Sequence, residues 1–409
     1  MERTIVGIDV GTTKVCTLVS EVSDDESLRI VGVGIVPARG VRKGVIVNVA
    51  EATQAIRLSV EKAERISGYD IERAHVSLAG AHVSSLNSRG VVAVQRGERG
   101  ITQEDVDRAM EAARAIAIPH DREVVHVIPR GYIVDGQEGI RDPIGMVGFR
   151  LEVEAHIITG AISSVQNLIK CVEDAGVGVD ELVLDPLASG EAVLSETERE
   201  MGVVLVDIGG GTTDIAVFIE GSIWHTTILA VGGNHLTNDI AVVMRMPNAA
   251  AEEAKIQQGH ACPETIDPAE AFQVMAFGDS VPARISRREL AQVIEARVEE
   301  ILSLVMQEIK RSGYDGLLPA GVVLCGGTAQ LRGIRELGRR VLKLPVRVGG
   351  PGDLQGLTDA IMSPAFATSV GLICWGQRQS AVSARAPHHG PGVGARFLSW
   401  LKALLPDRG

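Results

Sequence analysis

The 409-residue sequence has little that is typical of an extracellular, membrane-spanning or metal-binding chain. Its five cysteines lie far apart and form no C-x-x-C pair, which argues against a disulfide framework and against a zinc site. The first residues lack the basic and then apolar pattern of a secretory leader. No apolar run approaches the roughly 18–20 residues that a membrane span needs. We therefore expect a cytosolic body with reduced cysteines.

Aromatic residues and positive charge are also scarce. Aromatics make up 3% of the chain while hydrophobic residues make up 45%, a composition typical of an α/β protein built on Val, Ile, Leu and Ala. The formal net charge is −12, which makes nucleic acid an improbable partner for the body. The length exceeds what one small core can organise, so we expect several domains or subdomains.

Two segments of the chain are copies of one pattern. Residues 5–19 read IVGIDVGTTKVCTLV, and residues 203–218 read VVLVDIGGGTTDIAVF. Each predicts a strand, an aspartate, a short Gly/Thr turn and a second strand, which is a β-hairpin and not a strand-to-helix loop. Because the two acids, Asp9 and Asp207, lie far apart in the chain, the sequence predicts two related halves.

Other segments complete the outline. Residues 321–334, GVVLCGGTAQLRGI, predict a buried strand, a turn at Gly326-Gly327-Thr328 and a helix. Residues 83–161 interrupt the rhythm with strand patterns near 90–95, 124–134 and 151–159. A capping-box pattern at Thr102 and Asp105 predicts a helix after Thr102, so we expect a small inserted domain. A second capping box at Ser286 predicts a helix with one apolar face, formed by Leu290, Ile294, Val298, Ile301, Val305 and Ile309.

The Gly/Thr turns are suited to phosphate. Glycines expose backbone N–H groups with no Cβ in the way, and the threonines add hydroxyls. An acid just before the turn would be repelled by phosphate, so its natural partner is Mg²⁺ or the waters of that ion. Two such hairpins facing each other would grip a triphosphate, with Asp9 and Asp207 beside the metal. For one hairpin alone, a tight glycine turn with an edge Asp explains the pattern equally well.

Other phosphate motifs are absent from the sequence. There is no G-x-x-x-x-G-K-[ST], and Gly32-Val33-Gly34 runs into Pro37 where a dinucleotide fingerprint needs glycine. The hairpins, the turn at 321–334 and the helical segments 182–194 and 364–376 instead resemble the five-motif pattern of the actin and heat-shock-chaperone ATPase superfamily. Within it, segments 79–90, 141–160 and 232–241 resemble the FtsA family of bacterial cell division proteins.

This resemblance implies an α/β, actin-like (ribonuclease-H-like, duplicated) fold with an inserted small α+β domain of the SHS2 type and a C-terminal amphipathic helix. It implies the following divisions of the chain: 1–82 with 162–195 and 351–378 as the first core, 83–161 as the insert, 196–235 with 316–350 as the second core, 236–315 as its outer subdomain, 379–394 as a flexible linker and 395–409 as a membrane-targeting helix.

The resemblance also implies a site for ATP or ADP with Mg²⁺. The first phosphate loop would be Gly11, Thr12, Thr13 and Lys14, and the second Gly209, Gly210, Gly211, Thr212 and Thr213. The nucleoside would lie near Gly232, Gly233, Lys255, Gly326, Gly327 and Thr328. Asp185 would position the attacking water, or would only cap the helix that begins before Pro186. We expect nucleotide binding with at most weak ATPase activity.

The C-terminal residues predict a membrane anchor. Phe397, Trp400, Leu401, Leu404 and Leu405 follow helical spacing and form one apolar stripe, and Arg396 and Lys402 lie on the other side. From Gly376 onward there are five Lys/Arg and one Asp, a net +4 on a chain of −12. A short basic amphipathic helix on a linker favours anionic lipid, although a terminal helix docked on the body is the alternative. Because one such helix binds reversibly, polymerisation would provide the avidity.

Further partners are implied by the resemblance. FtsA-like proteins tether the tubulin homologue FtsZ, whose C-terminal peptide would dock near the helix 287–311, where Arg297 and Glu300 lie off the apolar face. A solvated pair within the helix explains these two residues equally well. The insert would serve the homopolymer and later divisome membrane proteins. The location would be the cytoplasmic side of the inner membrane at the septum.

Two other functions stay open from the sequence. One is a sugar-kinase-like phosphotransferase or an active ATPase, which would need an acceptor pocket and a catalytic acid in addition to Asp185. The other is a soluble scaffold of the pilus-assembly type with the same insert, which would bind a short peptide of a membrane partner.

Overall fold

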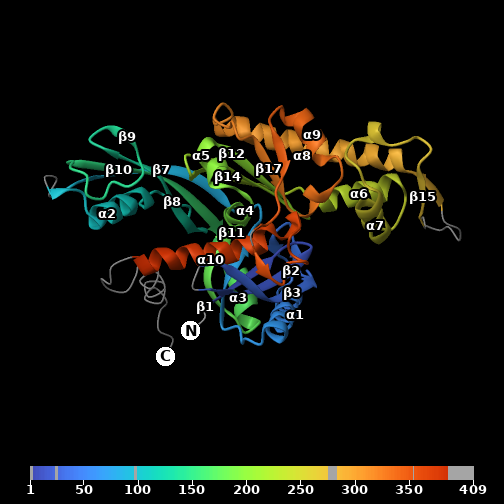
Figure 1. Ribbon diagram of the computed structural model, residues 1–409, viewed down its shortest axis with the longest axis horizontal. Helices are drawn as coiled ribbons and strands as arrows, with labels where there is room; N and C mark the ends of the chain where they lie inside the picture. The colour runs from blue at the N-terminus through green and yellow to red at the C-terminus, as the bar shows by residue number, and fades with distance from the viewer. Residues whose placement is uncertain (1–2, 24–25, 96–98, 275–282, 353, 386–409) are drawn as a thin grey trace.

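The computed structural model describes residues 3–23, 26–95, 99–274, 283–352 and 354–385. The molecule is elongated, with the sheet of the insert at one end and a small hairpin, β15 (Ala271–Val274) with β16 (Ala283–Ser286), at the other (Figure 1). Within the described ranges, none of the helices combines the length and the hydropathy that a membrane crossing requires.

The first half is built on a six-stranded sheet. Its strands are β1 (Arg3–Val10), β2 (Lys14–Val22), β3 (Leu28–Pro37), β6 (Arg73–Leu78), β11 (Gly178–Leu184) and β19 (Gln355–Gly356). They lie in the order β11-β6-β1-β2-β3-β19, with β1, β2 and β3 antiparallel and with β6 and β11 parallel to β1. A two-stranded ribbon, β4 (Val41–Arg42) with β5 (Val45–Ile46), precedes the first helix.

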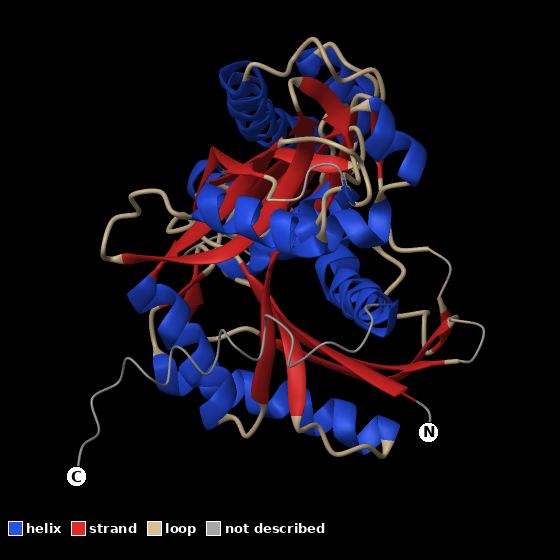
Figure 2. Cartoon of the chain, turned by 90° about the vertical axis from the view of Figure 1, so that its left-hand side faces the viewer, coloured by secondary structure: helices blue, strands red, loops and turns tan. Residues whose placement is uncertain are grey.

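Helices cover both faces of this sheet (Figure 2). One face packs against α1 (Val49–Ser67) and α3 (Ile162–Asp174), and the other packs against α10 (Ala367–Arg385). The strands alternate accordingly, since Ile8 and Val15 contribute to the α1 side and Ile5 and Leu18 to the α10 side.

The second half repeats the first. Its sheet contains β12 (Val203–Ile208), β13 (Thr213–Ile219), β14 (Ser222–Leu229), β17 (Val322–Cys325) and β18 (Val346–Val348), in the order β14-β13-β12-β17-β18. The first three strands are antiparallel and the last two run parallel to β12, as in the first sheet. The two related halves predicted from the paired hairpins are therefore confirmed.

Helices surround the second sheet and extend from it. They are α4 (Asp185–Val193), α5 (Glu196–Met201), α6 (Gly233–Val243), α7 (Asn248–Gln258), α8 (Arg287–Ser312) and α9 (Ile334–Leu342), with short 3₁₀ turns η2 (Pro263–Thr265), η3 (Gly327–Gln330) and η4 (Pro364–Phe366). Ser286 caps α8 by accepting a hydrogen bond from the amide of Glu289, and the predicted apolar face of that helix is fully buried. The amphipathic pattern is therefore confirmed, and the bond between Ser286 and Glu289 is one half of the predicted capping box.

The insert has a sheet and a core of its own. Its strands β7 (Ser84–Ala93), β8 (Arg122–Val134), β9 (Gln137–Ile140) and β10 (Arg150–Ala161) lie in the order β7-β10-β8-β9, and α2 (Gln103–Arg114) packs on β7 and β10. The capping box of Thr102 and Asp105 is present at the start of α2. The predicted α+β insert is thus observed.

The C-terminal segment corrects one expectation. Composition predicts a flexible linker over 379–394, but α10 continues to Arg385, so the prediction is wrong over 379–385. These residues include Gln379, Ala381 and Ala384, which a helix accommodates well. The rest of the predicted linker and the predicted amphipathic helix 395–409 lie outside the described residues.

Candidate functional site

The two Gly/Thr loops share one backbone geometry. In the first loop the amide of Gly11 donates to the carbonyl of Lys14 at 3.0 Å. The corresponding bond in the second loop joins Gly209 and Thr212, also at 3.0 Å. Both loops therefore close as the same tight turn between antiparallel strands, and each begins two residues after an aspartate.

The loops face each other at contact distance. A Cβ added to Gly210 would lie 2.1 Å from Oγ1 of Thr13, and one added to Gly211 would lie 2.7 Å from Oγ1 of Thr12. Glycine is needed at these positions because any side chain would displace the opposite loop. The glycines thus allow the two halves to approach closely around whatever lies between their loops.

The third turn brings β17 against the second aspartate. Gly326 has φ +85°, which favours glycine, and a Cβ at this position would lie 2.3 Å from Oδ1 of Asp207. The turn continues into η3, where Oγ1 of Thr328 donates to the carbonyl of Gly209 at 3.2 Å. The three Gly/Thr turns therefore meet at one place.

A cleft of about 560 Å³ lies between the three turns. Most of the predicted site residues line it: Asp9, Gly11, Thr12, Thr13, Lys14, Asp185, Asp207, Gly209, Gly210, Thr212, Gly233, Lys255, Gly326, Gly327 and Thr328. Gly211, Thr213 and Gly232 do not line it. Thr213 donates to the carbonyl of Val231 at 2.8 Å, and Gly211 and Gly232 pack against neighbouring loop atoms, so these three residues shape the loops.

The cleft also contains residues that the sequence did not single out. Among them are Asp214, Asn234, Glu252 and Thr368. Asp214 had a local signal, because it lies directly opposite Asp207 in the β12–β13 register. Glu252 had none, and Thr368 was included only as part of the helical segment 364–376, since helices distant in sequence bring both residues to the cleft.

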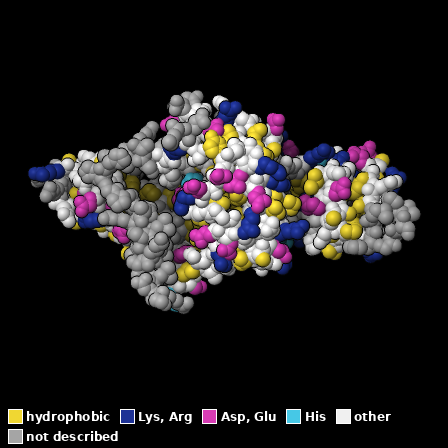
Figure 3. Space-filling model, turned by 90° about the horizontal axis from the view of Figure 1, so that it is seen from below, with side chains coloured by type: hydrophobic (Ala, Val, Ile, Leu, Met, Phe, Trp, Pro, Cys, Tyr) yellow, Lys and Arg dark blue, Asp and Glu magenta, His cyan; other side chains and the backbone are white. Residues whose placement is uncertain are grey.

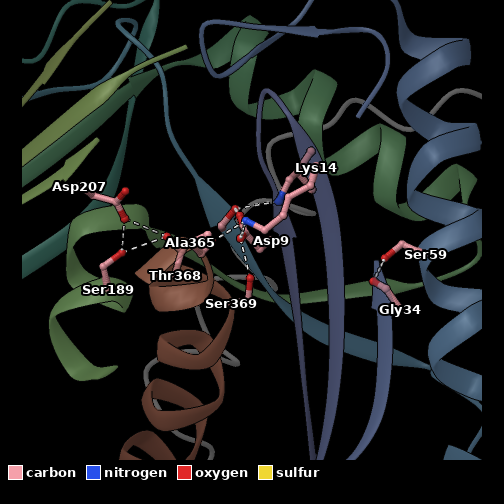
Figure 4. A network of polar contacts seen from close by, with 11 residues as sticks. Asp9, Lys14, Gly34, Ser59, Ser189, Asp207, Ala365, Thr368 and Ser369 are labelled. Carbon is pink, nitrogen blue, oxygen red and sulfur yellow. Dashed lines mark hydrogen bonds and ion pairs between the residues drawn. The ribbon is translucent and has the colours of Figure 1, made fainter. Parts of the chain in front are cut away.

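Asp9 and Asp207 are held by hydroxyl groups from consecutive residues of α10 (Figure 4). Ser369 Oγ donates to Asp9 at 2.7 Å, and Thr368 Oγ1 donates to Asp207 at 3.2 Å. Asp207 also accepts a hydrogen bond from Ser189 Oγ of α4 at 2.6 Å. Burial nevertheless raises the pKa of the Asp207 carboxyl.

Lys14 is the basic side chain nearest to these acids. Its Nζ lies 3.7 Å from Oδ2 of Asp9 and donates to the carbonyl of Ala365 at 2.7 Å. It also lies 4.8 Å from the centroid of the Phe366 ring. The amine is therefore held beside the first loop by a carboxylate, a carbonyl and an aromatic face.

Asp185 and Asp214 are buried carboxylates with unused hydrogen-bonding capacity. Oδ1 of each has no hydrogen-bond partner. Burial raises the pKa of Asp185 well above its ordinary value, and the charges of Asp214, Asp9 and Asp207 add to this effect. Burial and the charge of Asp207 likewise raise the pKa of Asp214. The cleft thus concentrates negative charge that the described side chains only partly offset.

The helix-capping explanation of Asp185 is wrong. The N-cap of α4 is Leu184, Asp185 is the first helical residue, and no side chain caps this end. The Asp185 carboxylate lines the cleft instead.

The far side of the cleft carries a compact polar group from α6 and α7. Lys255 Nζ donates to Glu252 at 2.7 Å, to Thr237 Oγ1 at 2.9 Å and to the carbonyl of Gly233 at 3.2 Å. Thr237 also donates to Glu252. Because these side chains hydrogen-bond to one another, they form an ordered wall of the cleft.

Direct metal coordination has no ready-made ligand set. Among the residues that the structure describes, no three His, Cys, Asp or Glu side chains are grouped to hold a metal ion. Asp185 and Asp214 nevertheless line the cleft, and each has an unpartnered carboxylate oxygen, the kind of hard donor that suits Mg²⁺ or its bound waters.

Arg297 contacts a residue of another helix in addition to its predicted partner Glu300 within α8. Its guanidinium contacts Asp239 of α6 through Nε at 2.6 Å and Nη2 at 3.1 Å, and contacts Glu300 at 2.5 Å. It therefore ties two helices together. The predicted membrane residues Arg396, Phe397, Trp400, Leu401, Lys402, Leu404 and Leu405 lie outside the described residues.

Two sheets that share one five-strand topology and enclose a cleft between paired Gly/Thr hairpins define an actin-like fold. Solved structures agree: the PilM–PilN type IV pilus biogenesis complex (TM-score 0.66, 15% identity, 91% of this chain and 98% of that chain), MreB5 of Spiroplasma citri bound to ADP (0.56, 16%, 94% and 99%) and a MamK double helical filament (0.50, 14%, 94% and 100%). At such identities the likeness shows the fold alone.

Sequence comparison identifies the family. The model of the family "Cell division protein FtsA" matches residues 204–371, and that of the "SHS2 domain inserted in FTSA" matches residues 80–159. The cell division protein FtsA of Pseudomonas aeruginosa is 45% identical over 92% of this chain and 90% of its own length, and that of Escherichia coli is 37% identical over 98% and 96%. The chain belongs to the FtsA family of actin-like cell division proteins.

Proposed function

We propose that this chain is an ATP-binding adaptor that polymerises on the inner face of the cytoplasmic membrane and anchors the FtsZ ring there. The observation that carries the proposal is the cleft, in which two facing Gly/Thr loops and four buried acidic side chains surround one cavity. Membership of the FtsA family supports the role in cell division.

In this proposal the two loops bind the phosphates. Backbone amides of the two loops, other than those of Gly11 and Gly209 that close the turns, donate to phosphate oxygens, and Lys14 adds a positive charge. Gly232, Gly233, Lys255 and the turn 326–328 surround the ribose and base. The structure of a fold relative, MreB5, bound to ADP supports this assignment of the cleft.

Mg²⁺ bound with the nucleotide would offset the carboxylate charge and polarise the terminal phosphate. Asp9 and Asp207 would hold it through water, since each already accepts hydroxyl donors from α10. Asp185, with its free Oδ1, would orient the attacking water and, through water, the Mg²⁺. A single buried acid in this role is consistent with slow hydrolysis at most.

Nucleotide binding can be tested by titrating fluorescent ADP and ATP with and without Mg²⁺. Gly210→Ala places a Cβ 2.1 Å from Thr13 Oγ1, so we expect affinity to fall by about tenfold, the equivalent of roughly 1.4 kcal/mol. Gly316→Ala is the matched control, because a Cβ there meets nothing within 4 Å. Equal affinity of the two variants would contradict the assignment of the cleft.

Membrane attachment is assigned to residues 395–409, with Phe397, Trp400, Leu401, Leu404 and Leu405 inserted in the lipid and Arg396 and Lys402 at the headgroups. The described part of the lower face carries interspersed acidic and basic side chains, which offer no strong attraction to an anionic surface (Figure 3). The tail is therefore the segment to test.

Co-sedimentation with anionic liposomes tests this assignment. The full chain is compared with a truncation ending at Arg385, which keeps all of α10, each with and without ATP and Mg²⁺. We expect only the full chain to pellet, and ATP to strengthen its binding if polymerisation multiplies the anchors. Equal sedimentation of both proteins would show that the tail is not the anchor.

FtsZ binding is assigned to the subdomain that carries α8. In this proposal Arg297 and Glu300 contribute to the surface that receives the C-terminal peptide of FtsZ, while the insert serves the polymer and later divisome proteins. Fluorescence polarisation with the labelled peptide tests the assignment. We expect Glu300→Ala to change the affinity while leaving α8 tied to Asp239, and an unchanged affinity would remove Glu300 from the interface.

The two alternatives are separable. A phosphotransferase would release phosphate from ATP only with an added acceptor, whereas the proposed adaptor would release it slowly from ATP alone. A soluble pilus-type scaffold has the same fold, as the likeness to the PilM–PilN complex illustrates. Membership of the FtsA family argues against that scaffold, and the liposome experiment tests it.

A further inference from the structure

The first turn of α4 separates two cavities. Asp185 lines the nucleotide cleft, while Leu187, two residues further along α4, lines a second cavity of about 660 Å³. The second cavity lies where β8 of the insert faces β11 and α10, and its wall includes His126, Glu181 and Trp375. A contact at the base of α4 can therefore affect both cavities.

His126 makes such a contact. Its Nε2 accepts a hydrogen bond from the backbone amide of Leu184 at 3.2 Å, and the bond is buried. Leu184 is the last residue of β11 and the N-cap of α4. Because β11 is an edge strand, this amide has no neighbouring strand on that side, and the insert provides its acceptor.

The imidazole is itself held in place. Its Nδ1 lies 4.0 Å from Oε1 of Glu181, and its ring packs edge-on against Trp375 with 5.8 Å between centroids. The indole of Trp375 donates to the other oxygen of Glu181 at 2.8 Å. Accepting from Leu184 requires an unprotonated Nε2, and burial favours this neutral ring by lowering the pKa of His126 to about 4.

The Asp185 carboxylate lacks a comparable constraint of its own. Oδ1 has no hydrogen-bond donor, and no side chain caps the helix on which Asp185 is the first residue. Its position in the cleft therefore depends on the backbone at Leu184 and Asp185. The Cα atoms of these neighbours are about 3.8 Å apart, so a shift of one moves the other.

We propose that His126 is a positioning residue, which fixes the Leu184–Asp185 backbone and through it the carboxylate that faces the nucleotide. The inference rests on the proposed nucleotide site and deepens it. It places one determinant of that site on the insert, outside the two actin-like halves, so that the docking of the insert and the geometry of the cleft are coupled through one hydrogen bond.

Hydrogen exchange tests the bond without nucleotide. His126→Phe keeps a ring against Trp375 but removes the acceptor, whereas His126→Gln keeps an acceptor at the same depth. We expect peptides that contain Leu184 to exchange at least about tenfold faster in the Phe variant and at nearly the wild-type rate in the Gln variant. Equal exchange in the wild type and the Phe variant would overturn the proposal.

Nucleotide measurements test the effect on Asp185. The readouts are the ATP turnover rate, the ATP affinity and the Mg²⁺ concentration that half-saturates ADP binding. For His126→Phe we expect ATP affinity near that of the wild type, turnover lowered by about 10–100-fold, as a displacement of about 1 Å can cause, and a higher Mg²⁺ requirement. His126→Gln should restore most of both losses.

Two further variants exclude a general structural effect. His156 is a buried histidine on β10 of the same insert, bonded to Asn87 and Thr226 and not to Leu184, so His156→Phe should leave turnover and Mg²⁺ requirement unchanged. In an Asp185→Asn background, His126→Phe should have no additional effect, since both changes act on one group. Equal losses in both histidine variants, or additive losses with Asp185→Asn, would overturn the proposal.

The outcomes are distinguishable from failure of the proposed function. A wild-type chain that binds neither ATP nor ADP contradicts the nucleotide site, whereas the exchange experiment still decides whether His126 holds Leu184. If the wild type binds nucleotide without measurable turnover, the Mg²⁺ requirement takes the place of the rate, and an unchanged requirement in His126→Phe overturns the proposal.

Discussion

Replacing Asp214 by Asn should stabilise the nucleotide-free protein. Asp214 is 2% exposed, Oδ1 has no partner, and Oδ2 accepts one hydrogen bond, from Thr212 Oγ1 at 3.1 Å. Burial and the charge of Asp207 raise its pKa, and its own charge raises the pKa of Asp185. The isosteric amide keeps an acceptor for Thr212 and removes one of the mutually repelling charges.

The expected gain is about 1–2 kcal/mol in the free energy of unfolding, the upper part of the range that is common for single stabilising substitutions. For a chain of this size each kcal/mol corresponds to roughly 2–4 °C in the midpoint of thermal unfolding. The pH dependence of this stability gain follows from the linkage between protonation and folding. The raised pKa makes the folded state favour the protonated acid, so the penalty in the wild type is largest at high pH and disappears as the pH falls through that pKa.

Thermal unfolding followed by circular dichroism, at several pH values and with or without ATP and Mg²⁺, is the assay. Asp214→Asn should unfold at a higher temperature than the wild type, by a margin that shrinks on acidification. Asp9→Asn is the matched control, because Ser77, Ser369 and Lys14 already satisfy that carboxylate, so its removal should bring no gain. The reasoning would be refuted if the Asp214→Asn protein were less stable than the wild type, or if the difference in unfolding temperature did not change with pH.

Three other predictions concern stability and the turns. Gly326→Ala should destabilise the chain by about 2 kcal/mol or more, measured by urea unfolding, because φ is +85° and the Cβ would lie 2.6 Å from a backbone carbonyl. Burial lowers the pKa of His156 to about 3, so between about pH 7.5 and about pH 5.5 only the unfolded chain takes up a proton at this residue. Over that range the free energy of unfolding should fall by about 1 kcal/mol more in the wild type than in His156→Gln. Arg297→Ala should cost about 1 kcal/mol through loss of the two bonds to Asp239, whereas Glu300→Ala, at an exposed position, should cost less than about 0.5 kcal/mol by chemical denaturation.

The duplication of the two halves could be predicted from the sequence because the hairpin pattern that reveals it is local. A strand, an acid, a Gly/Thr turn and a strand occupy about fifteen consecutive residues, and the structure has both hairpins in that form. The capped start of α8 and its buried stripe were likewise predictable, since capping and helical periodicity act over one to a few turns.

What the sequence missed depends on tertiary placement. Thr368 and Ser369 lie in segment 364–376, which the sequence indicated only as a helix, and they reach the two aspartates because α10 packs between the halves. The end of α10 was misjudged because Ser, Gln and Arg suit a solvated helix as well as a linker. The unsatisfied oxygen of Asp185 could not be read either, because a pattern of letters does not report which donors are absent from a buried site.

The two neighbouring hydroxyls at the start of α10 have a mechanical consequence. Thr368 bonds Asp207 of the second half and Ser369 bonds Asp9 of the first, from adjacent Cα atoms about 3.8 Å apart. The helix cannot follow both aspartates if the halves rotate apart. Because α10 packs on β1, β2 and β6 of the first half and also on α4, such a rotation requires one of the two hydroxyl bonds to break. The paired hydroxyls therefore oppose relative rotation of the two halves.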